Sequence, residues 1–243
     1  MSVLTSMYLG VFSHSYSRTI FLISIHSHLL PSGRTVRFKA GSIGEKNQQK
    51  VLEAAVKIFS RKGFSGARID EIAKQAGMSK TNMLYYFKTK QELYQVVIVR
   101  VLRQWLGSLG QLHSDDQPIE VITQYISKKM HLSRQYPEAS RLIAMEIISG
   151  APMIGDFLKT ELTSWVKEKG EVFLLWQKEG LMAPIDPAHV FFMIWALTQT
   201  YADFESQISA VTKPKNYEKE IYPPATGYVV EVLVRGLNLK PRL

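Results

Sequence analysis

The fold is decided by residues 65–92, which read SGARIDEIAKQAGMSKTNMLYYFKTKQE. Ile69, Ile72, Ala73 and Ala76 recur at i, i+3, i+4 and i+7, so they form one apolar stripe along a helix. Gly77 follows the stripe directly, and glycine readily takes the left-handed conformation that ends many helices. The pattern predicts a helix that begins at Ile69 and a sharp turn at Gly77.

A second short helix is predicted immediately after that turn. The Ser79 hydroxyl can cap it by accepting a hydrogen bond from a backbone N–H of the first helical turn. Met83 and Phe87 fall on its inward face. The outward face is polar and cationic, which suits base edges and phosphates in a DNA major groove. It carries Lys80, Thr81, Asn82 and Tyr85. An ordinary helix pair with a solvated face is the alternative.

The excess positive charge lies beside this helix pair. The chain has 30 Lys and Arg against 21 Asp and Glu, a net charge of +9. Residues 93–243 are neutral overall, whereas residues 43–92 carry ten basic and five acidic groups and residues 1–42 carry four basic groups and no acid. Such an asymmetry indicates binding to a polyanion.

Helical periodicity continues through the rest of the chain. The Thr89-x-x-Glu92 capping box opens one of these helices, and Asp186-Pro187 opens another. No stretch of strand-type alternation and no internal repeat is present in the sequence. The fold class is therefore predicted to be all-α, with helices over 46–62, 89–106, 118–136, 138–148, 153–179, 188–210 and 225–237.

The stretch GARIDEIAKQAGMSKTNMLYYFKTKQEL resembles the DNA-binding domain of the TetR family of bacterial one-component repressors, with similarity from about Lys46 to Leu93. The stretches YPEASRLIAMEIISGAP and LMAPIDPAHVFFMIWALTQTYADF, with the Ser-Lys-Thr-Asn run at residues 79–82, are similar to a pyrimidine-utilisation (Rut) subgroup that responds to uracil and thymine. The resemblance implies a TetR-type fold. A three-helix, helix-turn-helix DNA-binding domain at 43–92 follows an extension at 1–42 and precedes a ligand-binding and dimerisation domain at 93–243.

The resemblance also implies which residues meet DNA. Lys80, Thr81, Asn82 and Tyr85 are predicted to contact bases. Many members have Thr where Ala67 stands and Tyr where Leu84 stands, and both contact phosphates, so other residues are expected to substitute for them. The predicted DNA-binding residues are Arg68, Ser79, Lys80, Thr81, Asn82, Tyr85, Tyr86, Lys88 and Lys90.

A small effector is predicted to bind in the apolar surroundings of residues 140–204. A Gln amide and a Thr hydroxyl could match the edge of a pyrimidine while an aromatic side chain stacks on its ring. In the alternative, the polar groups, Asp203 among them, cap helices or join across a dimer. The predicted effector residues are Glu146, Phe192, Trp195, Thr198, Gln199 and Tyr201.

The helix predicted over 188–210 is apolar almost all round in its first ten residues, whereas a helix on a monomer surface should be amphipathic. We therefore expect it to pack partly on a second subunit. In the family the last two helices form a four-helix dimer interface, and here the last would supply Val229, Val230, Val232, Leu233 and Val234. A monomer core helix is the alternative.

Other classes of function are less well supported. The chain has no cysteine, and its six histidines form no ligand pair at helical spacing, so we expect no metal, no cofactor and no enzyme activity. The run TIFLISIHSHLL is too short and too polar to span a bilayer, so we expect a cytoplasmic protein with no membrane partner.

The predicted function is a transcriptional repressor that leaves its operator when a pyrimidine such as uracil or thymine binds. One alternative is a TetR-type repressor with a different effector, for example in drug or lipid efflux. Alternatives of another class are a helical enzyme using Glu146 and Asp203 with His131 or His189, and an adaptor whose basic end binds an acidic partner.

Overall fold

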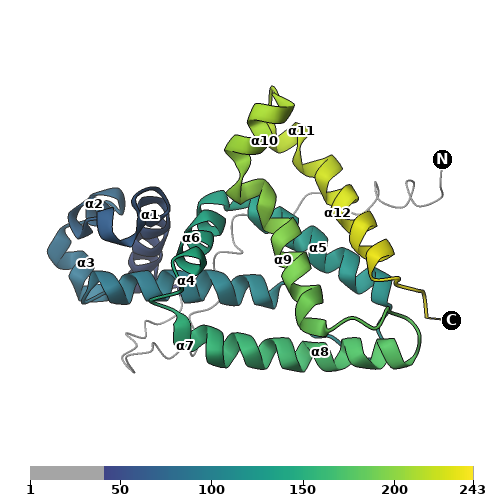
Figure 1. Ribbon diagram of the computed structural model, residues 1–243. Coiled ribbons are helices and arrows are strands. Elements are labelled where there is room, and N and C mark those ends of the chain that lie inside the picture. Colours follow the sequence, from purple (N-terminus) through teal and green to yellow (C-terminus); the bar gives the residue numbers. More distant parts are fainter. Residues whose placement is uncertain (1–40, 243) are drawn as a thin grey trace. The chain divides into compact units, whose positions relative to one another are not determined.

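The computed structural model describes residues 41–242, and every regular element within them is a helix (Figure 1). The all-α prediction is confirmed. Residues 1–40 of the predicted extension lie outside the described residues. Residues 46–243 form one compact unit. No described helix is long and apolar enough to cross a membrane.

The first four helices are two short ones between two longer ones. They are α1 (Ile43–Gly66), α2 (Ile69–Gln75), α3 (Lys80–Tyr86) and α4 (Lys90–Gly107). The backbone of α1 breaks at Gly63 (φ +64°), where the sequence predicted the end of that helix. Thr89 caps α4 by accepting from the Glu92 N–H at 3.0 Å, and Glu92 accepts from the Lys88 N–H at 2.9 Å.

The remaining helices form a bundle. They are α5 (Pro118–Gln135), α6 (Pro137–Ile148), α7 (Gly155–Phe157), the π-helical turn η3 (Leu158–Leu162), α8 (Thr163–Lys178), α9 (Pro187–Asp203), α10 (Glu205–Thr212), α11 (Tyr217–Glu220) and α12 (Tyr222–Gly236). Helix α5 packs against both α9 and α12, and α8 packs against α9 (Figure 1). The largest side chains buried between these helices are those of Tyr125, Phe173, Trp176 and Phe191.

Three predicted helix boundaries were wrong. The helix expected over 188–210 ends at Phe204, whose backbone (φ −112°, ψ 30°) separates α9 from α10. The stretch 153–179 is interrupted by η3. Helix α12 begins at Tyr222 rather than 225, because Pro223 and Pro224 occupy its first turn, where a missing N–H costs no hydrogen bond.

Helix α12 also corrects the predicted dimer surface. Val229, Val230 and Leu233 are at most 4% exposed and belong to the core of their own subunit. Val232, on an adjacent side of the helix, is 38% exposed. Since i and i+4 residues share a helical face, the outward stripe of α12 is Pro224, Tyr228, Val232 and Gly236.

Candidate nucleic-acid interface and effector site

The turn between α2 and α3 has the geometry that its sequence predicted. Gly77 has a left-handed backbone (φ +72°), its N–H donates to the Lys74 carbonyl at 3.1 Å, and the Met78 N–H donates to the Ala73 carbonyl at 3.0 Å. The Ser79 hydroxyl then accepts from the Asn82 N–H at 3.1 Å. These bonds satisfy backbone groups at both helix ends and so fix the direction in which α3 leaves the turn.

Helix α3 presents the predicted face to the outside. Met83 and Phe87 are buried at 0% and 1% exposure. Lys80, Thr81, Asn82 and Tyr85 are all exposed. Because the inward pair anchors the helix, the outward face is a rigid polar surface without a large apolar group apart from the Tyr85 ring.

Lys80 on this face and Lys88 just after α3 make only weak contacts. Lys80 forms an ion pair with Asp70 at 3.1 Å, with both side chains more than half exposed. An exposed pair of this kind is worth ~0–1 kcal/mol, so DNA can readily replace it. The Lys88 ammonium lies 5.7 Å from the centre of the Tyr85 ring. Both cations therefore remain available to a phosphate or a base.

Two other predicted DNA-binding residues are engaged within the protein. Tyr86 is 7% exposed, and its hydroxyl accepts from the Asn47 amide at 3.2 Å. The half-buried Lys90 donates to the Ala67 carbonyl at 3.1 Å and lies over the Phe64 ring at 4.6 Å. Arg68, the N-cap of α2, and Ser79 are exposed. Phosphate contacts by Tyr86 and Lys90 stay predictions, and both residues also hold the domain together.

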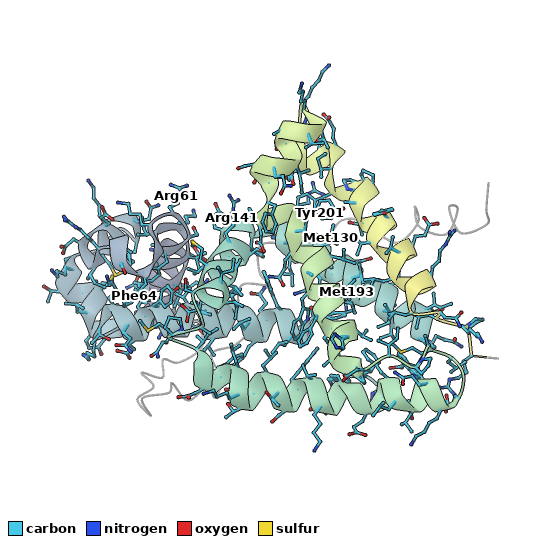
Figure 2. All side chains as sticks on the ribbon, viewed as in Figure 1. Arg61, Phe64, Met130, Arg141, Met193 and Tyr201 are labelled. Atoms are coloured by element: carbon cyan, nitrogen blue, oxygen red, sulfur yellow. The ribbon has the colours of Figure 1, made fainter. Side chains whose placement is uncertain are left out.

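The predicted effector residues on α9 adjoin an aromatic cluster in the bundle. The Trp195 indole N–H donates to the Tyr125 hydroxyl at 3.0 Å, and its ring lies 6.0 Å from Phe191 and 6.3 Å from Trp165. Phe192 is 53% exposed, although its ring still lies 6.0 Å from Trp195. Helices α5 and α9, which carry the labelled Met130, Met193 and Tyr201, can be followed in Figure 2.

The polar members of the predicted set differ in what they already bind. The buried Thr198 hydroxyl donates to the Ile194 carbonyl at 2.7 Å. The half-buried Gln199 makes no side-chain hydrogen bond within the described part of the chain. The backbone carbonyl of Tyr201 accepts from the Tyr217 hydroxyl at 2.7 Å, and burial raises the pKa of the Tyr201 hydroxyl. Gln199 is thus the member whose amide is free to meet a ligand.

Both carboxylate oxygens of Glu146 already accept hydrogen bonds from groups of the protein. Its buried carboxylate accepts from the Tyr94 hydroxyl at 3.0 Å and from the Met153 N–H at 2.7 Å. Burial, and then the charge of Glu146, raise the pKa of Tyr94, so that Tyr94 remains a donor. The carboxylate thus joins α4 to the segment after α6 within one subunit, which is not the contact across a dimer given as an alternative for these polar groups.

Lys129 is the charged residue among the buried polar residues that the sequence did not predict. It is 3% exposed, and its ammonium lies 4.3 Å from the centre of the Trp105 ring on α4. Within residues 41–242 it forms no hydrogen bond and no ion pair. The available signal was helical phase, because Lys129 falls on the same face as the inward Ile122 and Ile126.

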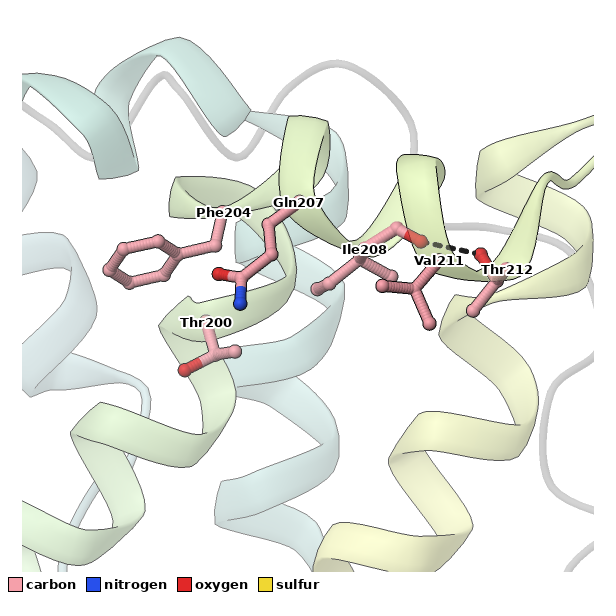
Figure 3. Close-up of a pocket in the computed structure, with 6 residues that line it drawn as sticks. All are labelled: Thr200, Phe204, Gln207, Ile208, Val211 and Thr212. Atoms are coloured by element: carbon pink, nitrogen blue, oxygen red, sulfur yellow. Dashed lines mark hydrogen bonds between the residues drawn. The ribbon is translucent and has the colours of Figure 1, made fainter.

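A surface groove lies at the other end of α9. Thr200, Phe204, Gln207, Ile208, Val211 and Thr212 line it, on α9, on α10 and at the break between them (Figure 3). None of the predicted effector residues is among its lining residues. Among the described residues, no three His, Asp or Glu side chains gather in a way that could hold a metal ion.

A helix-turn-helix with an exposed cationic face, followed by a helical bundle, defines the class of one-component DNA-binding regulators. Residues 51–97 match the family of bacterial regulatory proteins of the tetR type, and residues 98–240 match the C-terminal region of YcdC-like proteins. The chain therefore belongs to the TetR family of transcriptional regulators, whose members bind operator DNA and typically dimerise, and it is not an enzyme.

Individual relatives are also regulators. The HTH-type transcriptional regulator RutR of Escherichia coli is 42% identical over 191 residues, which span 79% of this chain and 90% of RutR. The biofilm operon regulator IcaR of Staphylococcus epidermidis is 21% identical over 72% of this chain and 95% of its own length. A solved transcriptional regulator from Streptomyces coelicolor shares the fold, with a TM-score of 0.62 and 23% identity over 80% of this chain and 99% of its own.

The exposed face of α3 gives a first prediction. Asn82→Ala should cost ~1–3 kcal/mol on the preferred operator and little on unrelated duplexes, because it removes a base-edge contact. Lys88→Ala should weaken both kinds of duplex equally and flatten the dependence of log K on log salt by about 1 per subunit. Fluorescence anisotropy on a selected operator and a scrambled duplex measures both effects. Lys178→Ala, at an exposed position of α8, is the control and should bind both duplexes as the wild type does. Loss of sequence preference in Lys88→Ala but not in Asn82→Ala would contradict these roles.

Lys129 gives a prediction about pH. Burial lowers the pKa of Lys129 to about 7, although Asp203 on α9, itself bonded to Ser140 and near Arg141 on α6, opposes that shift. Between pH 7 and the unfolded pKa of ~10.4, the unfolded chain binds a proton that the folded chain does not. Stability should therefore rise with pH in this window, by up to ~1.4 kcal/mol per pH unit.

Denaturant titrations from pH 7.5 to 9.0 test this expectation. Lys129→Met should remove the rise, because methionine binds no proton. The exposed neighbour Lys128→Met should retain it. An equal slope in the wild type and in Lys129→Met would contradict the expectation.

Proposed function

We propose that this regulator is a homodimeric repressor that leaves its operator when a small pyrimidine, uracil or thymine, binds in the bundle. In this proposal residues 43–92 bind DNA and residues 93–243 bind the effector and form the dimer. The observation that carries the proposal is the exposed polar face of α3, held by two buried residues within the most basic part of the chain. The two family matches, which meet within α4, support the division.

Two exposed apolar stripes support the dimer. On α9 and at its end, Phe192, Met193 and Phe204 are each more than half exposed. On α12, Tyr228 is 64% and Val232 is 38% exposed. Helices α9 and α12 pack against each other, and contiguous exposed apolar groups mark protein interfaces. Two copies joined through these stripes would present two α3 helices, one for each half of a two-fold symmetric operator.

The dimer proposal predicts the effect of one charge. Val232→Glu should give monomers in light scattering and lose operator binding, because a carboxylate would be buried without a partner in the interface. Leu174→Glu is the matched control, since Leu174 is 40% exposed on α8 and outside both stripes. Leu233 is unsuitable for this test because it is buried in the core of its own subunit. A Val232→Glu dimer with full operator affinity would refute the proposed interface.

The effector proposal is supported by the resemblance of residues 136–152 and 181–204 to the uracil- and thymine-responsive subgroup and by 42% identity to RutR. Within the bundle, Gln199 offers both an amide donor and an acceptor, one helical turn from Trp195. Three aromatic neighbours of Trp195, namely Phe191, Trp165 and Phe192, supply apolar surface for a planar ring.

Calorimetry with uracil tests this site. The wild type should bind uracil with micromolar affinity, within the limit of ~1.5 kcal/mol per heavy atom, and binding should release operator DNA. Gln199→Ala should weaken binding by ~1–3 kcal/mol because an edge of the ring loses its partner. Gln207→Ala is the control, since Gln207 lines the surface groove instead. If only Gln207→Ala weakens uracil binding, the effector binds in that groove. If another metabolite binds and pyrimidines do not, the repressor proposal stands and the pyrimidine proposal is wrong.

A further inference from the structure

The interior of the bundle contains a lysine side chain that forms no hydrogen bond and no ion pair with the described residues. Lys129 is 3% exposed, and its amino group lies 4.3 Å from the centre of the Trp105 ring. A cation over an aromatic face gains ~0.5–2 kcal/mol, whereas leaving a buried ammonium without hydrogen bonds costs several kcal/mol. The protein alone therefore gives this side chain a poor environment.

The half-buried carboxylate of Asp203, which attracts Lys129, is already engaged elsewhere. Asp203 attracts Lys129 electrostatically, but it accepts a hydrogen bond from the Ser140 hydroxyl and lies near the Arg141 guanidinium. No ion pair within 4.0 Å joins it to Lys129. The three hydrogens of the ammonium thus remain available for an acceptor that comes from outside the chain.

Lys129 also lies beside the aromatic cluster of α9. It follows Tyr125 by four residues of α5, on the same face and ~6 Å along the helix axis. The Tyr125 hydroxyl is the acceptor of the Trp195 indole N–H, at 3.0 Å. A ligand that stacks near Trp195 can therefore reach the Lys129 ammonium with an oxygen at its edge.

We propose that Lys129 is a specificity-determining residue of the effector site, where its ammonium donates a hydrogen bond to a carbonyl oxygen of the bound pyrimidine. Trp105 forms the wall behind the ammonium, and Gln199 meets another part of the ring edge. This inference rests on the proposed pyrimidine effector. It also gives the chemistry of any effector: a compound with an exposed oxygen acceptor binds, because a lysine amine donates hydrogen bonds in both protonation states.

The test compares Lys129→Met with the exposed neighbour Lys128→Met. Methionine keeps the length and apolar stem of lysine and removes the charge and the donors. If Lys129 serves the effector, Lys129→Met should keep its thermal midpoint or raise it and should bind operator as the wild type does. Its uracil affinity by calorimetry should fall at least tenfold, and uracil at concentrations that release the wild type should leave it on DNA. Lys128→Met should match the wild type throughout.

Two results would overturn the inference. Unchanged uracil affinity in Lys129→Met would show that the ammonium does not contact the ligand. A lower thermal midpoint together with unchanged affinity would show a purely structural role. If Lys129→Met fails to fold, Lys129→Gln, which retains donors without charge, should fold and bind uracil more weakly than the wild type; wild-type affinity in that variant would also overturn the inference.

A second arm separates this inference from the proposed function. If wild-type protein binds neither uracil nor thymine, the pyrimidine proposal fails by itself. A thermal-shift panel of neutral carbonyl compounds, carboxylates and cationic amines is then run on the wild type and on Lys129→Met. A carbonyl or carboxylate compound that stabilises only the wild type supports the role of Lys129. Equal shifts in both proteins, or stabilisation by the amines alone or by no compound, overturn it.

Discussion

The structure depends on one buried carboxylate, that of Glu146, which joins the DNA-binding helices to the bundle. It accepts from the Tyr94 hydroxyl on α4 and from the Met153 N–H after α6. The Tyr94 ring packs edge-on against Phe59 at 4.8 Å and against Phe64 at 5.1 Å, both in α1. Because an unpaired buried acceptor costs ~1–3 kcal/mol, α4 and α6 cannot separate without loss of stability. The Glu146–Tyr94 bond thus links α6 to α4, and the Tyr94 ring links α4 to α1.

That link gives the proposed repressor a physical route for its switch. An effector changes DNA affinity tenfold only if it binds one arrangement of the two subunits ~1.4 kcal/mol more tightly than the other. The proposed effector residues lie on α9, which packs on α6, and α6 carries Glu146. A ligand held between α5 and α9 would therefore act on the helix that is bonded to α4.

The apolar residues of α9 divide between a face buried in the core and an exposed face. Phe191, Ile194 and Thr198 face the core, while Phe192 and Met193 face outward. The sequence shows only that too few polar residues are present for a solvent face, and it does not show how the apolar residues divide. The division follows from packing, since α5 and α8 cover one side of α9 within the subunit. The exposed side is left for the proposed partner subunit.

The sequence by itself determined the local features: the helix pair around Gly77, the Ser79 cap, the inward Met83 and Phe87, and the all-α fold. Each depends on interactions between residues a few positions apart, so spacing and residue type suffice. Only the tertiary structure decided that Tyr86 is buried, that Glu146 joins two helices, that α9 ends at Phe204 and that Lys129 lies over Trp105. Those outcomes depend on which faces are covered by helices that are distant in the sequence. The residue pattern of a single helix does not show which other helix packs against it.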